Sequence, residues 1–493
     1  MISSHLPVLQ VIVPMIAAPL CVLLRRDKYA WALATLVTWA ILAMVSLLLI
    51  QVINEGEVIY HLGGWPPPYG IEYRLDALNT YVLLMISAIA AVVTPFAAKS
   101  VAREIEPHRR HLFYAVYLLT LTGLLGIVAS GDAFNVYVFL EIASLGSYVL
   151  IGLGPKRQAL KSAYKYLIQG TIGATFILIG IGLLYMMTGT LNMADLAERI
   201  GPVADTRPVI VAFAILTVGI LIKLALFPLH LWLPGAYTHA PSTVSAFLAA
   251  TSTKVGAYLL LRFVFTVFGT DFAFGKMPLM EILMPLSLIA IVAGSAAAIG
   301  KKDAKRLLAF SSVGQIGYLA LGVSFATVTG LTGGIVHIFN HGLTKGGMFL
   351  ALGCVAYRLG NTRIESLYGL GRRMPLTSAA LMLGGLGLIG VPGTAGFISK
   401  WYLVQAAIES DLWPVAVIVL LGSLIALVYV GRLVEAAYFH IPDTTAGEVH
   451  EAPASMLIPT WILIAGSIYF GFHTELTVGV AETAALTLMG SAP

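Results

Sequence analysis

The sequence is poor in charge and in cysteine. Only 11% of its 493 residues are charged, against roughly 25% in soluble domains. Its two cysteines, Cys21 and Cys354, lie in apolar runs without CxxC or Cys/His spacing, which predicts small core residues and disfavours an iron–sulfur cluster. GxxxxGK[ST] and a GxGxxG after a strand are also missing. We therefore expect no intrinsic cofactor and no bound metal, and an ion gradient or a partner as the energy source.

Apolar residues take the place of charge. They make up 58% of the chain, and the mean hydropathy is +0.90. Because about 20 apolar residues cross the hydrocarbon of a membrane, runs of this length separated by short polar turns predict about fourteen spans. They lie approximately at 7–24, 29–52, 77–98, 111–130, 132–154, 163–187, 208–227, 243–268, 278–299, 304–326, 331–355, 376–405, 412–437 and 455–472. We expect an all-α polytopic membrane protein, with 1–493 as a single transmembrane domain.

The basic residues are distributed unevenly between the turns. Most of the 29 lysines and arginines follow odd-numbered spans, as Arg25, Arg109, Lys302 and Arg372 do. By the positive-inside rule this side is cytoplasmic, so both termini should face the outer side of a cell (inner) membrane. We expect the first span to stay in the membrane, since no lysine or arginine precedes it and no cleavage site is evident. The formal net charge of +5 then reflects topology and not a nucleic-acid partner.

The two halves of the chain are weakly similar. Gln169-Gly170 resembles His341-Gly342, and Lys223 and Lys400 recur at nearly the same spacing, each beside Gly/Pro-rich sequence that can interrupt a helix. Five spans separate equivalent positions, an odd number, so the second copy would be inverted in the membrane. Inverted repeats with broken helices are typical of transporters. The predicted repeats are residues 111–268 and 278–437.

Isolated ionisable residues interrupt the apolar runs. A charge in hydrocarbon costs roughly 2.5–3.5 kcal/mol on insertion scales, so such residues usually face a bundle interior or a wet cavity. Together they suggest a path for protons or cations. The candidate proton-translocation residues are Glu141, Lys223, Lys254, His337, His341, Lys345 and Lys400.

Each candidate also has a structural interpretation. Glu141 would favour the charged form of a nearby lysine, and separating the two would release the proton of the lysine; the alternative is a static ion pair. Lys223 lies near the end of its span and could instead extend to the surface. Lys254 lies near mid-membrane, where that alternative fits poorly.

The second half contains a stripe of titratable residues. His337, His341 and Lys345 are spaced i, i+4, i+8, so they share one face of a helix and could support a water-bridged proton wire. They could also be packing residues. They do not form the zinc motif HExxH, because Ile338 occupies the position where that motif requires glutamate. Lys400 follows glycines and a proline that permit a broken helix, which makes it a candidate exit gate; the alternative is an interfacial belt.

Five segments are characteristic as a set. They are Phe134-Asn-Val-Tyr-Val-Phe-Leu-Glu141, Phe227-Pro-Leu-His-Leu-Trp-Leu-Pro234, Ala240-Pro-Ser-Thr-Val-Ser-Ala246, Lys305-Arg-Leu-Leu-Ala-Phe-Ser-Ser312 and Phe339-Asn-His341. Together they resemble the antiporter-like membrane subunits shared by respiratory complex I, membrane-bound hydrogenases and Mrp cation/proton antiporters. Pro234-Gly-Ala-Tyr237 departs from the Pro-Asp-Ala-His common in complex I and is more similar to the D subunit of Mrp antiporters.

The resemblance implies fourteen helices with two inverted five-helix repeats. It implies a Glu141–Lys223 ion pair, a relay through Lys254 and the two histidines, and a terminal Lys400. The implied function is that of a proton-translocating membrane subunit of a multisubunit Na+/H+ antiporter, without a redox active site of its own and with other membrane subunits as partners. One alternative is a pump subunit of a complex I-like NADH:quinone oxidoreductase or a membrane-bound hydrogenase. A non-transporting scaffold is another, and direct quinone chemistry is disfavoured because no redox motif is present.

Overall fold

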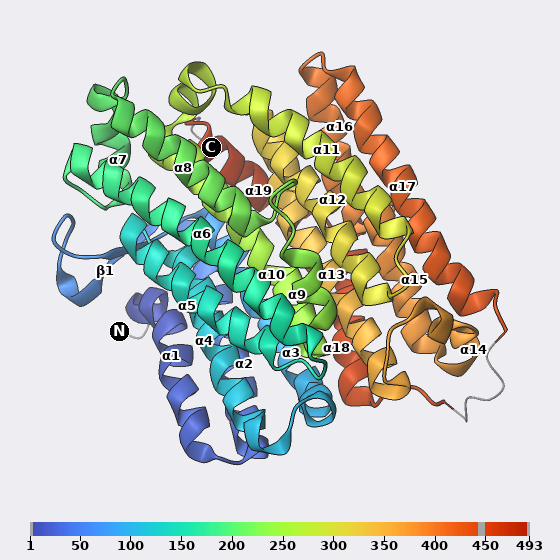
Figure 1. Ribbon diagram of the computed structural model, residues 1–493. Helices are drawn as coiled ribbons and strands as arrows, with labels where there is room; N and C mark the ends of the chain where they lie inside the picture. The colour runs from blue at the N-terminus through green and yellow to red at the C-terminus, as the bar shows by residue number, and fades with distance from the viewer. Residues whose placement is uncertain (1–2, 442–448, 491–493) are drawn as a thin grey trace.

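Long apolar helices lie side by side in one bundle in the computed structural model, which describes residues 3–441 and 449–490 (Figure 1). The first half contains α1 (Leu6–Leu24), α2 (Asp27–Glu55), α3 (Ala77–Glu104), α4 (Arg110–Ala129), α5 (Ala133–Gly152), α6 (Gln158–Thr188), α7 (Met193–Ile200), α8 (Arg207–Leu224), α9 (Leu233–His239) and α10 (Ser242–Leu261). The second contains α11 (Leu279–Ile299), α12 (Ala304–Ser324), α13 (Val328–Leu359), α14 (Leu370–Arg373), α15 (Pro375–Ile389), α16 (Ala395–Glu409), α17 (Trp413–Tyr438), α18 (Ala454–Phe472) and α19 (Glu475–Leu488).

The predicted class, a polytopic all-α membrane protein with broken helices, is confirmed. Within the described residues, 12 helices are long and apolar enough to cross a membrane. α13 has 32 residues and is buried along almost its whole length against α10, α12, α16 and α18. The predicted span 376–405 is two helices, α15 and α16, separated by a break. Adding α13 and the broken pair α15–α16 to these 12 helices gives the predicted number of about fourteen spans.

The turns of the bundle lie at two distinct ends. One, the arginine-rich end, brings together the basic turns: Arg110 lies 3.4 Å from Asp27, and Arg432 donates to the carbonyl of Lys301. The other, the hairpin end, contains the antiparallel strands β1 (Val58–His61) and β2 (Glu72–Leu75). The sequence predicts only a rigid turn in this connection, because each strand has four residues and is too short for a clear alternation pattern.

α8 breaks immediately after Lys223. Ala225 has a φ of 60°, a left-handed conformation that ends the helix. The indole nitrogen of Trp232 donates to the carbonyl of Ile222 at 3.0 Å, so one of the carbonyls freed at the helix end is satisfied. Trp232 itself is stacked on Tyr166, with ring centroids 3.8 Å apart. The break is therefore held in place by packing.

The second break separates α15 from α16. Gly390 and Gly393 have φ of 85° and 86°, values that residues with a Cβ rarely adopt. The ammonium of Lys400 donates to the carbonyls of Leu388 and Ile389, each at 2.9 Å. The second break thus places a lysine at the C-terminal carbonyls of the preceding half-helix, where a cation is favoured. The division into repeats at 111–268 and 278–437 stays a prediction.

Gly256 on α10 allows a close approach to α8 beside Lys223. A Cβ at this position would lie 3.0 Å from both the N and Cα atoms of Leu224, and backbone atoms cannot move aside as a side chain can. We expect Gly256→Val to separate α10 from α8 and to destabilise the chain by about 1–3 kcal/mol, the usual cost of overpacking. A lower melting temperature of the purified assembly measures this. Gly182→Val is the control, since a Cβ there meets nothing within 4 Å; equal melting of both variants contradicts the prediction.

Candidate ion-translocation site

Glu141 and Lys223 form a loose ion pair in the first half. The Lys223 ammonium lies 3.8 Å from Glu141 Oε1 and donates to the Ser144 hydroxyl at 2.8 Å. Glu141 Oε1 is buried and has no hydrogen-bond partner among the described residues. The lysine side chain is 7% exposed and that of the glutamate 27%. The predicted proximity is therefore observed, but serine and not the carboxylate makes the direct hydrogen bond.

A small cavity extends from Lys223 towards α10. It has a volume of about 30 Å3, and polar groups from Ser144, Ser147, Tyr166 and Ser252 line it beside the lysine. A space of this size with several polar walls can hold at least one water molecule. The cavity therefore joins Lys223 to α10, the helix that contains Lys254.

Lys254 occupies the middle of the bundle and is fully buried. Its ammonium donates to the carbonyl of Ala249, and no described carboxylate lies within ion-pair distance. His341 and Lys345 on α13 lie close enough to interact electrostatically with it. Lys254 therefore lies where α10 of the first half packs against α13 of the second.

The predicted stripe on α13 is present but its members face different neighbours. The rings of His337 and His341 are stacked with centroids 5.5 Å apart, and His337 Nδ1 lies 2.8 Å from the hydroxyl of Ser399. Lys345 turns towards α12, where it donates to the carbonyl of Leu308 at 2.8 Å and to Ser311. The stripe thus contacts α16 through a histidine and α12 through the lysine.

Lys400 is buried beside the break in the second half. Besides the two carbonyls of α15, its ammonium donates to the Ser423 hydroxyl at 3.0 Å and lies 4.7 Å from the centre of the Tyr318 ring. Ser399, its neighbour in sequence, contacts His337. Lys400 is 5% exposed, so it is an interior residue and does not lie at the lipid-facing surface.

Several hydroxyl residues of the site were missed from the sequence. Ser144, Ser311, Ser399 and Ser423 each receive or approach a candidate ionisable group. A usable signal existed for two of them: Ser144 follows Glu141 by three residues and Ser399 precedes Lys400 directly. The other two are on helices distant in sequence, and only packing brings them to their lysines.

His239 lies at the arginine-rich end, where α9 meets α6. Its Nδ1 is 3.0 Å from both the hydroxyl of Ser162 and the carbonyl of Gly235. Burial lowers the pKa of His239, because desolvation disfavours the imidazolium. The ring is therefore neutral near pH 7 and links two helices beside the broken segment.

A bundle with two broken helices and a buried series of lysines and histidines defines a membrane protein of the ion-translocating class. Residues 130–426 match the model of the NADH:quinone oxidoreductase/Mrp antiporter transmembrane family. The chain belongs to this family.

Named relatives fall into two groups. The N subunit of the NADH-quinone oxidoreductase of Desulforudis audaxviator is 39% identical over 488 residues, covering 96% of this chain and 97% of the relative. The D subunit of the Na(+)/H(+) antiporter of Bacillus subtilis is 28% identical over 487 residues, covering 99% and 97%. Both relatives align with this chain over nearly its full length.

Solved structures support the same fold. A chain of the archaeal membrane-bound sulfane sulfur reductase superposes with a TM-score of 0.90 at 30% identity, with 98% of each chain covered. A chain of the Mrp complex from a Dietzia species also gives a TM-score of 0.90, at 24% identity, with 99% of this chain and 98% of that chain covered. Both structures are of multisubunit membrane complexes, so other membrane subunits are expected partners.

Proposed function

We propose that this chain is the proton-translocating membrane subunit of a multisubunit Na+/H+ antiporter. The observation that supports this most strongly is the loose Glu141–Lys223 pair, in which the ammonium keeps a serine partner while a carboxylate oxygen has none. A pair held only for stability would be expected to satisfy both groups, since an unpaired buried charge is costly. A loose pair can open without losing all its hydrogen bonds.

Opening the pair would drive the proton forward. The negative charge of Glu141 stabilises the ammonium form of Lys223, and withdrawing it favours release of the proton. The small cavity beside this lysine extends to Ser252 on α10, the helix that contains Lys254, which is the next group of the proposed route. From there the proposed route continues to His341 and His337 and ends at Lys400, whose neighbour in sequence, Ser399, contacts His337 through its hydroxyl.

Buried polar atoms along this route support a water-assisted transfer. His337 Nε2, Asn340 Oδ1 and both ring nitrogens of His341 have no hydrogen-bond partner among the described residues. Groups of this kind are normally hydrogen-bonded, to protein or to ordered water. The second half would therefore contain water around the two histidines, which is what transfer between rings and lysine requires.

A partner subunit would cover the face of α5 that contains Glu141. Phe134, Val138 and Leu145 share one stripe with this residue and are exposed. The apolar members suit lipid, but a carboxylate with 27% exposure in the middle of a span does not. The exposed stripe is thus the expected contact with another membrane subunit of the complex.

The orientation follows from the arginine-rich end. We propose that this end is cytoplasmic and the hairpin end lies outside the cell membrane, so that both chain termini are on the outer side. Protons would then move between these two ends, and sodium or another monovalent cation would cross with the help of the partner subunits.

A second candidate function is supported by one relative. The 39% identical protein from Desulforudis audaxviator is named as a subunit of an NADH-quinone oxidoreductase, so this chain could pump protons in a redox-driven complex. Pro234-Gly-Ala-Tyr237, more similar to the Mrp antiporters, favours the first function. In both cases the buried residues would act alike and the energy source would differ.

The deciding experiment uses inverted vesicles containing the whole complex. Under the antiporter proposal, adding Na+ to acidified vesicles collapses the pH gradient with no NADH present. Under the second candidate, NADH oxidation builds a gradient and Na+ alone has no effect. Vesicles from cells lacking this chain are the control. If neither Na+ nor NADH moves protons in a complex that has assembled, the scaffold alternative replaces both.

A further inference from the structure

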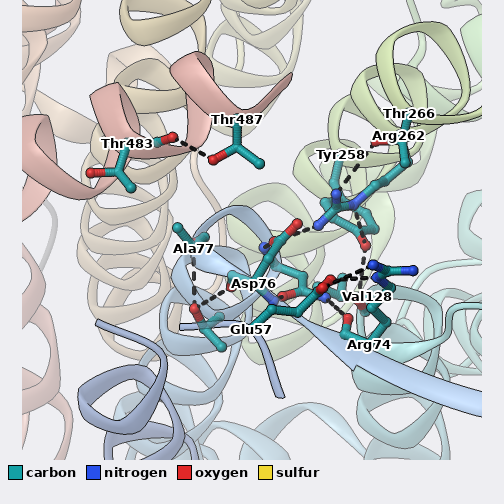
Figure 2. Close-up of polar contacts among 12 residues, drawn as sticks. Glu57, Arg74, Asp76, Ala77, Val128, Tyr258, Arg262, Thr266, Thr483 and Thr487 are labelled. Carbon is teal, nitrogen blue, oxygen red and sulfur yellow. Dashed lines mark hydrogen bonds and ion pairs between the residues drawn. The ribbon is translucent and has the colours of Figure 1, made fainter. Parts of the chain in front are cut away.

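A large hollow opens at the hairpin end of the first half, away from the proposed proton route. It has a volume of about 630 Å3. Figure 2 shows Thr483 and Thr487 of α19 on one side and Asp76, Arg74 and Arg262 on the other. A space of this size, lined in part by charged and hydroxyl side chains, holds many water molecules.

The hollow contains two ion pairs at different depths. At the rim, Arg74 binds the carboxylate of Glu57 through two nitrogens, and these side chains are 38% and 34% exposed. At the inner wall, the Arg262 guanidinium lies 2.5 Å from Asp76 Oδ1, with side chains 9% and 18% exposed. The inner pair joins the end of α10, where the π-helical segment η5 (Arg262–Phe268) begins, to the start of α3.

The inner pair is held firmly from both sides. Asp76 is the N-cap of α3, where it accepts from the backbone of Asn79 at 3.1 Å. Arg262 Nε donates to the Tyr258 hydroxyl at 3.0 Å, and that hydroxyl donates to the carbonyl of Val128 at 2.9 Å. Arg262, Tyr258 and Asp76 therefore form a hydrogen-bonded polar layer on the inner wall of the hollow.

Behind this layer lies the central lysine. Lys254, Tyr258 and Arg262 are spaced i, i+4, i+8 on one face of α10, and all three are buried. Lys254 is eight residues from Arg262, which is about 12 Å along the helix axis at 1.5 Å per residue. It is the next basic residue inward on this helix. Nothing else charged on α10 separates the central lysine from the hollow.

We propose that the hollow is a water-filled vestibule at the outer end of a branch leading along α10 to Lys254, and that the Arg262–Asp76 pair is its gate. This deepens the proposed function and rests on it. Closed, the pair seals the interior and its guanidinium repels hydronium and other cations, as a positive charge does in a selective pore. When the pair opens, Lys254 is connected to the solution at the hairpin end by a path that does not pass through Lys400.

The two partners of the gate make opposite predictions. Arg262→Gln removes the repelling charge and leaves the Asp76 carboxylate facing the hollow, so protons should leak. We expect the pH gradient to decay about tenfold faster with no Na+ present, which corresponds to a barrier lower by about 1.4 kcal/mol. Asp76→Asn keeps the N-cap, because asparagine caps as well as aspartate, but leaves the guanidinium unpaired. We expect no leak and slower Na+-driven exchange.

The rim pair provides the matched control. Glu57→Gln breaks the Glu57–Arg74 pair in the same hollow without touching Tyr258 or Asp76, so leak and exchange should stay at the wild-type level. All variants are measured as the whole complex in vesicles, at equal amounts of assembled complex judged by size-exclusion chromatography.

The outcomes separate the gate from the proposed function. If the wild-type complex exchanges Na+ for protons and Arg262→Gln leaks while Asp76→Asn slows exchange, the gate is supported. If the wild type exchanges and both variants behave like Glu57→Gln, or both only reduce assembly, the pair is structural and the gate is overturned. If the wild type itself does not exchange, the proposed function fails first.

Discussion

Lys223→Ala should abolish Na+-driven proton movement while leaving the complex assembled. The variant removes the ammonium that faces Glu141 at 3.8 Å and Ser144 at 2.8 Å, and with it the first group of the proposed route. We expect a fall of roughly 100-fold or more in the rate of exchange, the scale of a positioned proton-transfer group. Collapse of the pH gradient in inverted vesicles on adding Na+ measures this.

Lys161→Ala is the matched control for that experiment. This lysine lies exposed on α6, so its loss removes the same charge without touching the buried route, and exchange should be normal. Glu141→Gln is a second, independent test. The variant keeps the shape of the side chain but cannot stabilise the ammonium of Lys223, so exchange should also be lost. Unchanged exchange in Lys223→Ala at normal assembly would move the chain to the scaffold alternative.

Lys400→Arg should stop exchange while keeping the second break intact. An arginine keeps the positive charge and the hydrogen-bond donors that serve the carbonyls of Leu388 and Ile389. The guanidinium of arginine stays protonated in proteins, so it does not release a proton at physiological pH. A residue that only caps the half-helix would tolerate this change, whereas a proton-transfer residue would not. We again expect a loss of roughly 100-fold in the exchange rate.

Two comparisons make the Lys400 test specific. Lys161→Arg makes the same substitution at an exposed site and should leave the exchange rate unchanged. Melting of the purified complex reports whether the larger guanidinium disturbs the packing around Ser423 and Tyr318. Normal melting with normal exchange in Lys400→Arg would show that Lys400 only caps the helix, and the end of the proposed route would have to lie elsewhere.

The lysines of the route differ in how the protein stabilises their charge. Lys223 has a carboxylate nearby, whereas Lys254, Lys345 and Lys400 have only carbonyls, hydroxyls and a ring among the described residues. Neutral partners stabilise an ammonium less than a carboxylate does. In this series, only the charge of Lys223 can be stabilised or destabilised by moving a nearby described carboxylate. This fits a switch at the Glu141–Lys223 pair and a relay through the other lysines.

The sequence by itself determined the class and most of the candidate residues. Runs of apolar residues long enough to cross a bilayer depend only on composition and length, and they predicted the helices. Glycine and proline beside Lys223 and Lys400 predicted both breaks, because these residues act locally on the backbone. The i, i+4, i+8 spacing of His337, His341 and Lys345 was enough to place them on one helix face.

Apart from the Glu141–Lys223 pair, only the tertiary structure decided which partner each buried charge has. Lys345 binds α12 through Leu308 and Ser311 instead of continuing the histidine stripe, and Arg262 meets Asp76 across 186 residues of sequence. Such contacts depend on how helices far apart in the chain rotate and pack, and apolar spans give almost no sequence signal about which face meets which neighbour. For the same reason the short hairpin, the hollow and the loose fit of Glu141 against Lys223 became visible only once the bundle was assembled.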